Sequence, residues 1–126
     1  MCLCPNDPNI CVSLSCFDAV YKVWDISKQR VIKSIKHTGK SNVDDTSLYF
    51  IDERRVLIWY SFTDTVYVLD IIEEKFMQIA DGILPYISKK APWKYIKARD
   101  ELVVLSKNQK YFNIIDLESG NCLLWI

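Results

Sequence analysis

The feature that most constrains this chain is an internal repeat with a period of about 45 residues. Three seven-residue segments align without gaps, and each has an aspartate at its sixth position. These aspartates, Asp25, Asp70 and Asp116, lie 45 and then 46 residues apart. The segments read VYKVWDI, TVYVLDI and YFNIIDL. Periods of 20 to 50 residues are typical of arrays of small stacked units. The sequence therefore predicts three copies of one unit.

Each copy holds four short apolar runs rich in β-branched and aromatic residues, with turn residues between them. The runs cover 1–4, 11–14, 20–26 and 30–35, then 47–51, 56–59, 65–71 and 75–80, then 93–98, 102–105, 111–117 and 121–126. Such runs, separated by turn residues, predict β-strands. No stretch has the continuous i, i+3, i+4, i+7 spacing of an amphipathic helix. We therefore expect an all-β chain with four strands in each copy.

Several runs are apolar at consecutive positions, which indicates strands that are covered on both faces. Four-stranded antiparallel sheets that repeat every 45 residues and stack face to face describe the blades of a β-propeller. We expect a single domain over 1–126, with blades at about 1–37, 46–80 and 92–126.

Residues 12–25, VSLSCFDAVYKVWD, resemble the core of a WD40 repeat and end in the Lys-Val-Trp-Asp form typical of that family. Residues 116–121 resemble the turn after its third strand. Leu69 and Ile115 replace the tryptophan in the second and third copies. The resemblance implies a non-catalytic protein-interaction scaffold. It also implies that Asp18 and Trp24 belong to a hydrogen-bonded network that stiffens the blade, with Cys16 and Ser61 at the serine position of that network.

Three blades are fewer than the four to eight of a closed propeller. An exposed apolar sheet face forgoes about 1.5–3 kcal/mol for each large side chain that could be buried. We therefore expect an incomplete propeller that is completed by further blades, in the same chain or in a second chain, a homo-oligomer included. A purely structural segment of this kind is the alternative to an interaction scaffold.

Residues at loop tips on a rigid sheet are the natural candidates for partner binding. In a propeller of this type the relevant loops connect the blades and join the second strand to the third. The candidates are Phe17, Phe62, Tyr86, Lys89 and Lys90. The alternative for the two phenylalanines is that they fold back onto their own blades. We expect Asp25, Asp70 and Asp116 to be structural, since a carboxylate beside a turn accepts local backbone hydrogen bonds.

One local basic segment, 88–99, contains five cations and no acid, with Trp93 and Tyr95 among them. The chain as a whole has 16 basic and 16 acidic residues, so it lacks the long-range field that attracts polyanions. Strand alternation also divides the cations between two faces. A solvated loop, an acidic peptide partner and nucleic-acid contact remain the three interpretations.

The sequence gives little support for catalysis, cofactors or metals. It contains one histidine, His37, and lacks nucleotide-binding glycine loops and metalloprotease motifs. We expect His37 to be structural, the alternatives being a general base or a partner contact. The spacing of Cys2, Cys4, Cys11 and Cys16 does not match common zinc sites, so we expect reduced thiols.

The longest apolar runs are five residues, far below the roughly 20 that a membrane-spanning helix needs. The amino end has neither the cationic start nor the apolar stretch of a secretory signal. We therefore expect an intracellular, cytoplasmic protein, with the nucleus as the alternative.

Overall fold

A computed structural model describes residues 2–4, 7–41, 43, 46–60, 65–79, 93–105 and 112–125. These residues form three antiparallel sheets, which confirms the predicted all-β class. Sheet 1 contains β1 (Cys2–Leu3), β2 (Ile10–Ser15), β3 (Val20–Asp25) and β4 (Arg30–Lys36); sheet 2 contains β5 (Thr46–Phe50), β6 (Arg55–Tyr60), β7 (Thr65–Asp70) and β8 (Lys75–Gln78); sheet 3 contains β9 (Trp93–Ile96), β10 (Glu101–Leu105), β11 (Phe112–Asp116) and β12 (Cys122–Trp125).

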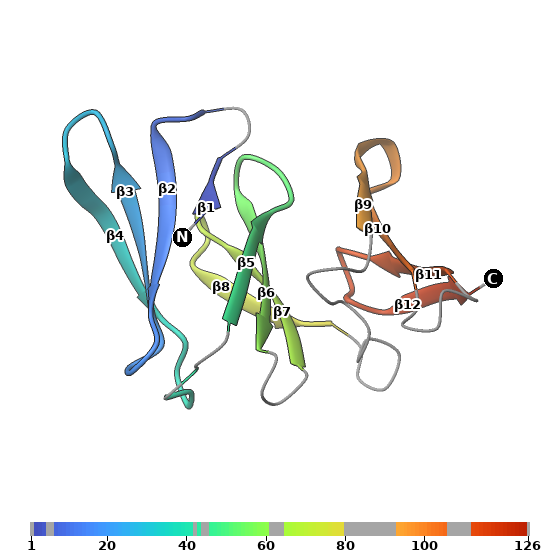
Figure 1. Cartoon of the computed structure of the whole chain (residues 1–126). Helices are drawn as coiled ribbons and strands as arrows, with labels where there is room; N and C mark the ends of the chain where they lie inside the picture. Colours follow the sequence, from blue (N-terminus) through green and yellow to red (C-terminus); the bar gives the residue numbers. More distant parts are fainter. Residues whose placement is uncertain are drawn as a thin grey trace.

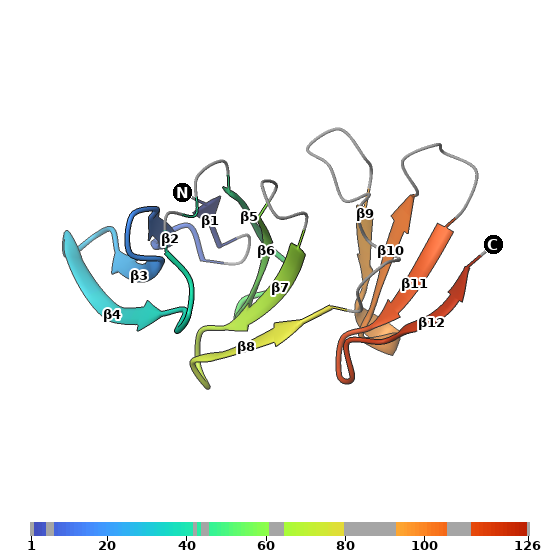
Figure 2. The same ribbon diagram turned by 90° about the horizontal axis from the view of Figure 1, so that it is seen from below.

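Each sheet is a meander in which consecutive strands are hydrogen-bonded neighbours. The three sheets stand one beside the next in chain order (Figure 1). Figure 2 shows that the first strands, β1, β5 and β9, lie along one side of the array, and the last strands, β4, β8 and β12, lie along the other. In the part of the chain that the structure describes, the three sheets do not close into a ring. They share no strand pairing, and their faces pack against one another in two cores.

The repeat in the sequence appears as one repeated register. The central cross-strand pairs are Val12 with Val23 in sheet 1, Leu57 with Val68 in sheet 2, and Val103 with Ile114 in sheet 3. Because side chains alternate between the two faces of a strand, this shared register assigns equivalent residues to equivalent faces.

Two separate cores fill the spaces between the sheets. The first core joins sheets 1 and 2, and its fully buried members include Val12, Tyr21 and Val56. The second core joins sheets 2 and 3, and its fully buried members include Leu57 and Leu102. Successive residues of β6 thus enter opposite cores. This two-sided burial explains the consecutive apolar residues of the sequence.

The third sheet departs from the expected pattern near its first hairpin. A strand is predicted for 93–98, but β9 ends at Ile96 and a 3₁₀ turn follows over Lys97–Arg99. The Asp100 N–H donates to the Lys97 carbonyl over 3.3 Å, and Asp100 has a left-handed backbone with φ of 52°. The Asp100 carboxylate accepts hydrogen bonds from Arg55 of sheet 2.

The turns between the third and fourth strands share one conformational feature. The residues four positions after Asp25, Asp70 and Asp116 have a left-handed backbone: the φ values of Gln29, Glu74 and Gly120 are 51°, 57° and 76°. Glycine adopts this left-handed conformation without strain, whereas residues with a Cβ do so at a cost. The sequence supplies glycine at only one of the three equivalent positions.

Candidate interaction site at the Phe17 turn

Of the five predicted partner-binding residues, Phe17 lies within the described residues, and Phe62, Tyr86, Lys89 and Lys90 lie outside them. Phe17 belongs to the four-residue turn 16–19 between β2 and β3, which we call the Phe17 turn. Its side chain is 80% exposed, the largest exposure among the large apolar side chains of the described residues. Phe17 therefore does not fold back onto its own sheet.

Three of the four carbonyls in the Phe17 turn are held by hydrogen bonds. The Cys16 carbonyl accepts from the Val43 N–H over 2.8 Å, and the Ala19 carbonyl accepts from the His37 N–H over 3.0 Å. The Lys36 ammonium donates to the Asp18 carbonyl. All three donors come from β4 or the segment after it. The turn is thus fixed to the connection between sheets 1 and 2, and the exposed phenyl ring is held on a rigid support.

Beneath this connection lies a buried chain of hydrogen-bonding side chains that crosses from sheet 1 to sheet 2. The His37 Nδ1 atom lies 2.6 Å from the Tyr60 hydroxyl, which lies 2.6 Å from the Tyr21 hydroxyl. The His37 ring also stacks on Phe76 with a centroid distance of 4.0 Å, and its edge contacts Tyr67 at 4.5 Å. His37 therefore anchors the sheet connection to the second sheet.

The ionisation of this cluster follows from its burial. His37 is 7% exposed, and desolvation, with a smaller contribution from the Lys40 charge, lowers its pKa to about 4. Desolvation likewise raises the pKa of Tyr60 to about 12. Both groups are neutral at pH 7, and a buried histidine held by two tyrosines and a phenylalanine does not suit a surface general base.

Lys40 covers the cluster on the same side. Its ammonium lies 5.3 Å from the centre of the Tyr67 ring and 5.9 Å from that of Tyr60. At these distances a cation is attracted to the electron-rich faces of both rings. The Lys40 N–H also donates to the His37 carbonyl over 3.1 Å. The connection is therefore held by its side chains as well as by its backbone.

Asp18 and Trp24, predicted as members of one network, have separate partners. The Trp24 indole donates to Ser13 Oγ over 2.8 Å. A hydrogen bond from Ser15 lowers the pKa of Asp18. Cys16 packs against the first core. Ser61, the equivalent of Cys16 in the second copy, lies outside the described residues. The sequence did not predict Ser13 and Ser15 as the partners of Trp24 and Asp18, because the resemblance places the network serine at position 16.

The three repeated aspartates are at the opposite end of the sheets, each at the start of a turn. Asp70 accepts from the N–H groups of Ile72 and Glu73 over 2.9 and 3.0 Å. Asp116 accepts from Glu118 and Ser119 in the same way, both over 3.3 Å. The arrangement resembles an Asx turn repeated in sheets 2 and 3.

Asp25 holds the equivalent turn of sheet 1 through a slightly different set of partners. Its carboxylate accepts from the Lys28 N–H over 3.1 Å and from the Ser27 hydroxyl over 2.8 Å. The Asn9 side-chain amide also donates to it over 2.8 Å. The hydrogen bond from Ser27, followed by that from the Lys28 backbone, lowers the pKa of Asp25. The three aspartates thus engage their own turns and do not converge on one site.

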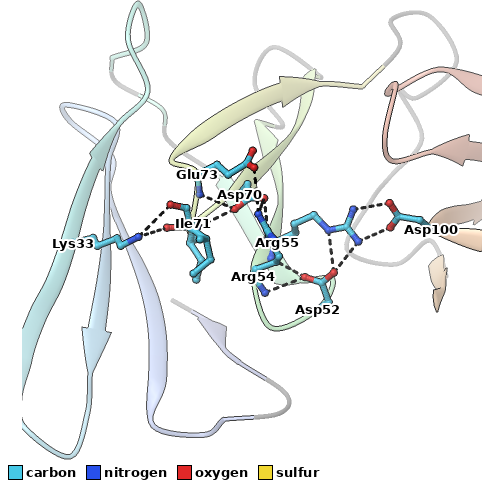
Figure 3. A network of polar contacts seen from close by, with 9 residues as sticks. Lys33, Asp52, Arg54, Arg55, Asp70, Ile71, Glu73 and Asp100 are labelled. Atoms are coloured by element: carbon cyan, nitrogen blue, oxygen red, sulfur yellow. Dashed lines mark hydrogen bonds and ion pairs between the residues drawn. The ribbon is translucent and has the colours of Figure 1, made fainter. Parts of the chain in front are cut away.

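The same end of the sheets carries an ionic contact between sheets 2 and 3 that the sequence did not predict (Figure 3). The Arg55 guanidinium donates to Asp52 Oδ2 over 2.7 Å and to Asp100 Oδ2 over 3.1 Å. It also donates to the Tyr95 hydroxyl over 2.9 Å. The hydrogen bond from Arg55 is the main cause of the lowered pKa of Asp100. Arg55 therefore ties the third sheet to the second.

A cation also links sheets 1 and 2 at this end. The Lys33 ammonium, from β4, donates to the carbonyls of Ile71 and Ile72 over 2.8 and 3.4 Å (Figure 3). These carbonyls belong to the turn between β7 and β8. Periodicity alone does not indicate such contacts, because it aligns equivalent residues but does not say which residues of neighbouring copies face each other.

In the described part of the basic segment, cations and aromatic rings separate. Trp93 and Tyr95 pack against the second core, whereas Lys94, Lys97 and Arg99 are exposed. Alternate residues of β9 point to opposite faces, so the rings do not stand among the cations on one surface. The described arrangement therefore lacks the stacked aromatic platform typical of single-stranded nucleic-acid binding.

Within the described ranges, no group of three or more His, Cys, Asp or Glu side chains is placed to hold a metal ion. The thiols of Cys4, Cys11 and Cys16 are free. In that same part of the chain, no helix is long and apolar enough to cross a membrane.

Comparison with known proteins relates the chain to others through its fold. No protein-family model matches the sequence, and no curated protein matches it. The WD40 β-propeller domain of Doa1 matches with a TM-score of 0.52 and 15% identity, covering 94% of this chain. The C-terminal WD40 domain of Sif2 matches with a TM-score of 0.52 and 13% identity, covering 98% of this chain. The chain spans about a third of those domains, 36% and 32%. The structure therefore has a divergent WD40-like β-propeller fold.

Proposed function

We propose that the chain is a non-catalytic protein-interaction scaffold whose three sheets are consecutive blades of an incomplete propeller, and that the Phe17 turn is a contact site for a partner protein. The observation that carries this proposal is the contrast between an 80% exposed phenyl ring and the three hydrogen-bonded carbonyls that hold its turn. An aromatic ring on a pre-organised support loses little conformational entropy on binding, and aromatic residues are frequent energetic anchors of interfaces.

The side chains around Phe17 define the kind of partner. Asp18 follows Phe17 in the turn, the Lys36 ammonium donates to the Asp18 carbonyl, and Lys40 lies on the adjoining connection. A matching surface offers an apolar pocket for the ring, with polar or acidic groups at its edge to meet the two lysines. Such a core of one apolar anchor with a polar rim is the usual anatomy of a protein interface.

The experiment is site-specific photo-crosslinking in the intact chain. A benzophenone amino acid is placed at Phe17 and, as a matched control, at Ile72. Ile72 is also apolar and exposed, at 59%, but lies in a turn at the opposite end of the sheets. We expect a defined crosslinked product from position 17 that position 72 does not give. In chains without a crosslinker, Phe17→Ser is expected to weaken binding of the partner so identified at least tenfold. Identical products from both positions would overturn the proposal, as would an absence of product from position 17.

A purely structural role is the second candidate, and an apolar pair on the outer face of sheet 3 favours it. Val103 and Ile114 are partly buried there, whereas their equivalents in sheets 1 and 2 are buried. A scaffold that also completes a propeller satisfies both roles. Removal of the Phe17 ring distinguishes them, because it affects partner capture and leaves the sheet interfaces intact.

A further inference from the structure

Strand β4 differs from the other two strands that end the sheets on the same side. In the described part of the chain, β4, β8 and β12 are each paired on one side only. Figures 1 and 2 both place β4 at the left-hand end of the array, with no described strand beyond it. β4 has seven residues, whereas β8 and β12 have four each. Natural sheets commonly keep edge strands short, because an open edge can pair with another strand. β4 therefore offers the longest open edge of the three.

The hydrogen bonds between β3 and β4 show which backbone groups of β4 face this open edge. Residue pairs in an antiparallel ladder alternate between pairs that exchange hydrogen bonds and pairs that do not. The His37 N–H donates to the Ala19 carbonyl over 3.0 Å. By this alternation Ile35, two residues earlier, is bonded to β3 in the same way. Ser34 and Lys36, at the intervening positions, therefore direct their backbone N–H and carbonyl groups away from β3.

Apolar side chains are exposed along the same strand. Val31 and Ile32 are 37% and 48% exposed, and Ile26, in the turn before β4, is 44% exposed. Ile32 is the extra residue of a β-bulge and has no residue opposite it on β3. Grouped apolar side chains on a surface are typical of interaction sites. The edge of β4 thus offers apolar contacts as well as backbone hydrogen-bonding groups.

β4 also belongs to a second basic stretch of the sequence, 26–43, which contains no acid. Its five cations are Lys28, Arg30, Lys33, Lys36 and Lys40. In the described part of the chain, ion pairs are formed by Arg54 and Arg55 and by none of these five cations. Like charges on facing strands are destabilising, so this composition disfavours pairing of β4 with a second copy of itself. It favours a strand that carries acidic side chains.

We propose that the open edge of β4 binds an extended acidic peptide as an added strand. The peptide backbone pairs with the outward groups of Ser34 and Lys36, its acidic side chains meet the cations of the 26–43 stretch, and its apolar side chains contact Val31 and Ile32. In strand addition, main-chain hydrogen bonds supply affinity and alternate side chains supply specificity. This surface is distinct from the contact proposed above at Phe17, and the proposal does not depend on that contact.

The test uses a synthetic peptide of the same length as β4 in which glutamate and valine alternate. Fluorescence polarisation of the labelled peptide measures its affinity for the intact chain. We expect saturable binding that weakens as salt is added, because salt screens exposed charges. The control peptide has the same sequence with every peptide nitrogen methylated. It keeps the charge but has no N–H donors, and it is expected not to bind.

A proline at Ser34 tests the backbone contact from the side of the chain. Ser34→Pro removes an N–H that faces the open edge, and proline is tolerated at such edge positions because no ladder hydrogen bond is lost. We expect it to weaken peptide binding about tenfold or more. Ser34→Ala, the matched control, keeps the N–H and is expected to change the affinity less than about twofold. Circular dichroism establishes that each variant is folded, and if Ser34→Pro is not, the methylated peptide tests the same hydrogen bonds.

The charge contribution has a matched pair of positions in sheets 1 and 2. Arg30 lies opposite Asp25, and Lys75 lies opposite Asp70 at the equivalent position of β8. Both cations are exposed. Arg30→Glu is expected to weaken peptide binding about tenfold or more, whereas Lys75→Glu is expected to change it less than about twofold.

The assignment is wrong if no saturable binding is found up to about 1 mM peptide, or if the methylated peptide binds equally well. Equal effects of Arg30→Glu and Lys75→Glu would also overturn it, because binding would then follow overall charge and not the edge of β4. Phe17→Ser is expected to leave the affinity for the peptide unchanged. Loss of peptide binding in that variant would place the peptide at the Phe17 turn and overturn the assignment, whereas a negative crosslinking result at position 17 leaves this test intact.

Discussion

The hydroxyl of Tyr21, on β3 of sheet 1, lies 2.6 Å from the hydroxyl of Tyr60, on β6 of sheet 2, and both are buried. Tyr60 also meets His37 Nδ1 at 2.6 Å. With neutral His37 protonated on Nε2, Tyr60 donates to His37 and Tyr21 donates to Tyr60, so each hydroxyl proton has one acceptor. Three residues from two copies of the repeat thus form one directional chain across an otherwise apolar interface.

Tyr60→Phe is expected to destabilise the chain more than loss of one hydrogen bond alone. The substitution leaves the Tyr21 hydroxyl and His37 Nδ1 buried without their partner, and such groups cost about 1–3 kcal/mol each. We expect the free energy of unfolding in urea to fall by about 2–3 kcal/mol. Tyr21→Phe in addition is expected to cost less than the sum of the single substitutions. Additive effects would contradict the existence of one hydrogen-bonded chain of Tyr21, Tyr60 and His37.

The stability of the chain is expected to fall as the pH is lowered from about 6.5 toward 4. Burial lowers the pKa of His37 from 6.5 to about 4, so the unfolded state binds more protons in this window and stability rises with pH. The slope is about 1 kcal/mol per pH unit, and the full effect is about 3 kcal/mol. Urea unfolding at several pH values measures it. His37→Asn is expected to remove most of the slope, and an unchanged slope would exclude His37 as its cause.

Neighbouring arginines are expected to differ in their contribution to stability. The Arg55 side chain is 16% exposed and meets Asp52 and Asp100, whereas the Arg54 side chain is 43% exposed and meets Asp70. Arg55→Gln leaves two carboxylates in a partly buried contact, and we expect a loss of about 2–4 kcal/mol. Arg54→Gln, the matched control, is expected to cost about 1 kcal/mol or less, because exposed ion pairs contribute little. Equal losses in thermal or urea unfolding would contradict the interpretation.

The equivalent turn residues Glu74 and Gly120 are expected to respond to substitution in opposite directions. Both have a left-handed backbone. A Cβ at Gly120 would lie 3.1 Å from the Gln78 carbonyl oxygen of sheet 2. Gly120→Ala is therefore expected to cost about 1–2 kcal/mol. Glu74→Gly relieves strain and is expected to be neutral or stabilising by up to about 1 kcal/mol, because greater freedom of the unfolded chain offsets part of the gain. Differential scanning calorimetry of the two variants provides the comparison.

A feature of the fold can be predicted from the sequence when the signal for it is local. The spacing of Asp25, Asp70 and Asp116 and the strand propensity of the runs between them predict the class of fold, because both are local properties. Strand ends are less well determined. Ile96 and Lys97 belong to one apolar run, and the 3₁₀ turn depends on the hydrogen bond from Asp100 to Lys97.

The candidate site was only partly predictable for the same reason. The sequence left exposure of Phe17 as one of two alternatives. The carbonyls of its turn accept hydrogen bonds from Lys36, His37 and Val43, which come from another part of the chain, and these bonds hold the turn so that the ring is exposed. The partnership of Arg55 with Asp100 depends on how two sheets approach each other. No periodicity within one strand contains that information.

The division of the interior into two cores has a consequence for how the chain comes apart. Val56 and Ile58 belong to one core and Leu57 to the other. When either outer sheet detaches, one whole face of sheet 2 therefore becomes exposed to solvent. Unfolding that begins at sheet 1 or sheet 3 therefore reaches the rest of the chain through these three adjacent residues. Strand β6 is the point at which local unfolding of one outer sheet becomes unfolding of the whole chain.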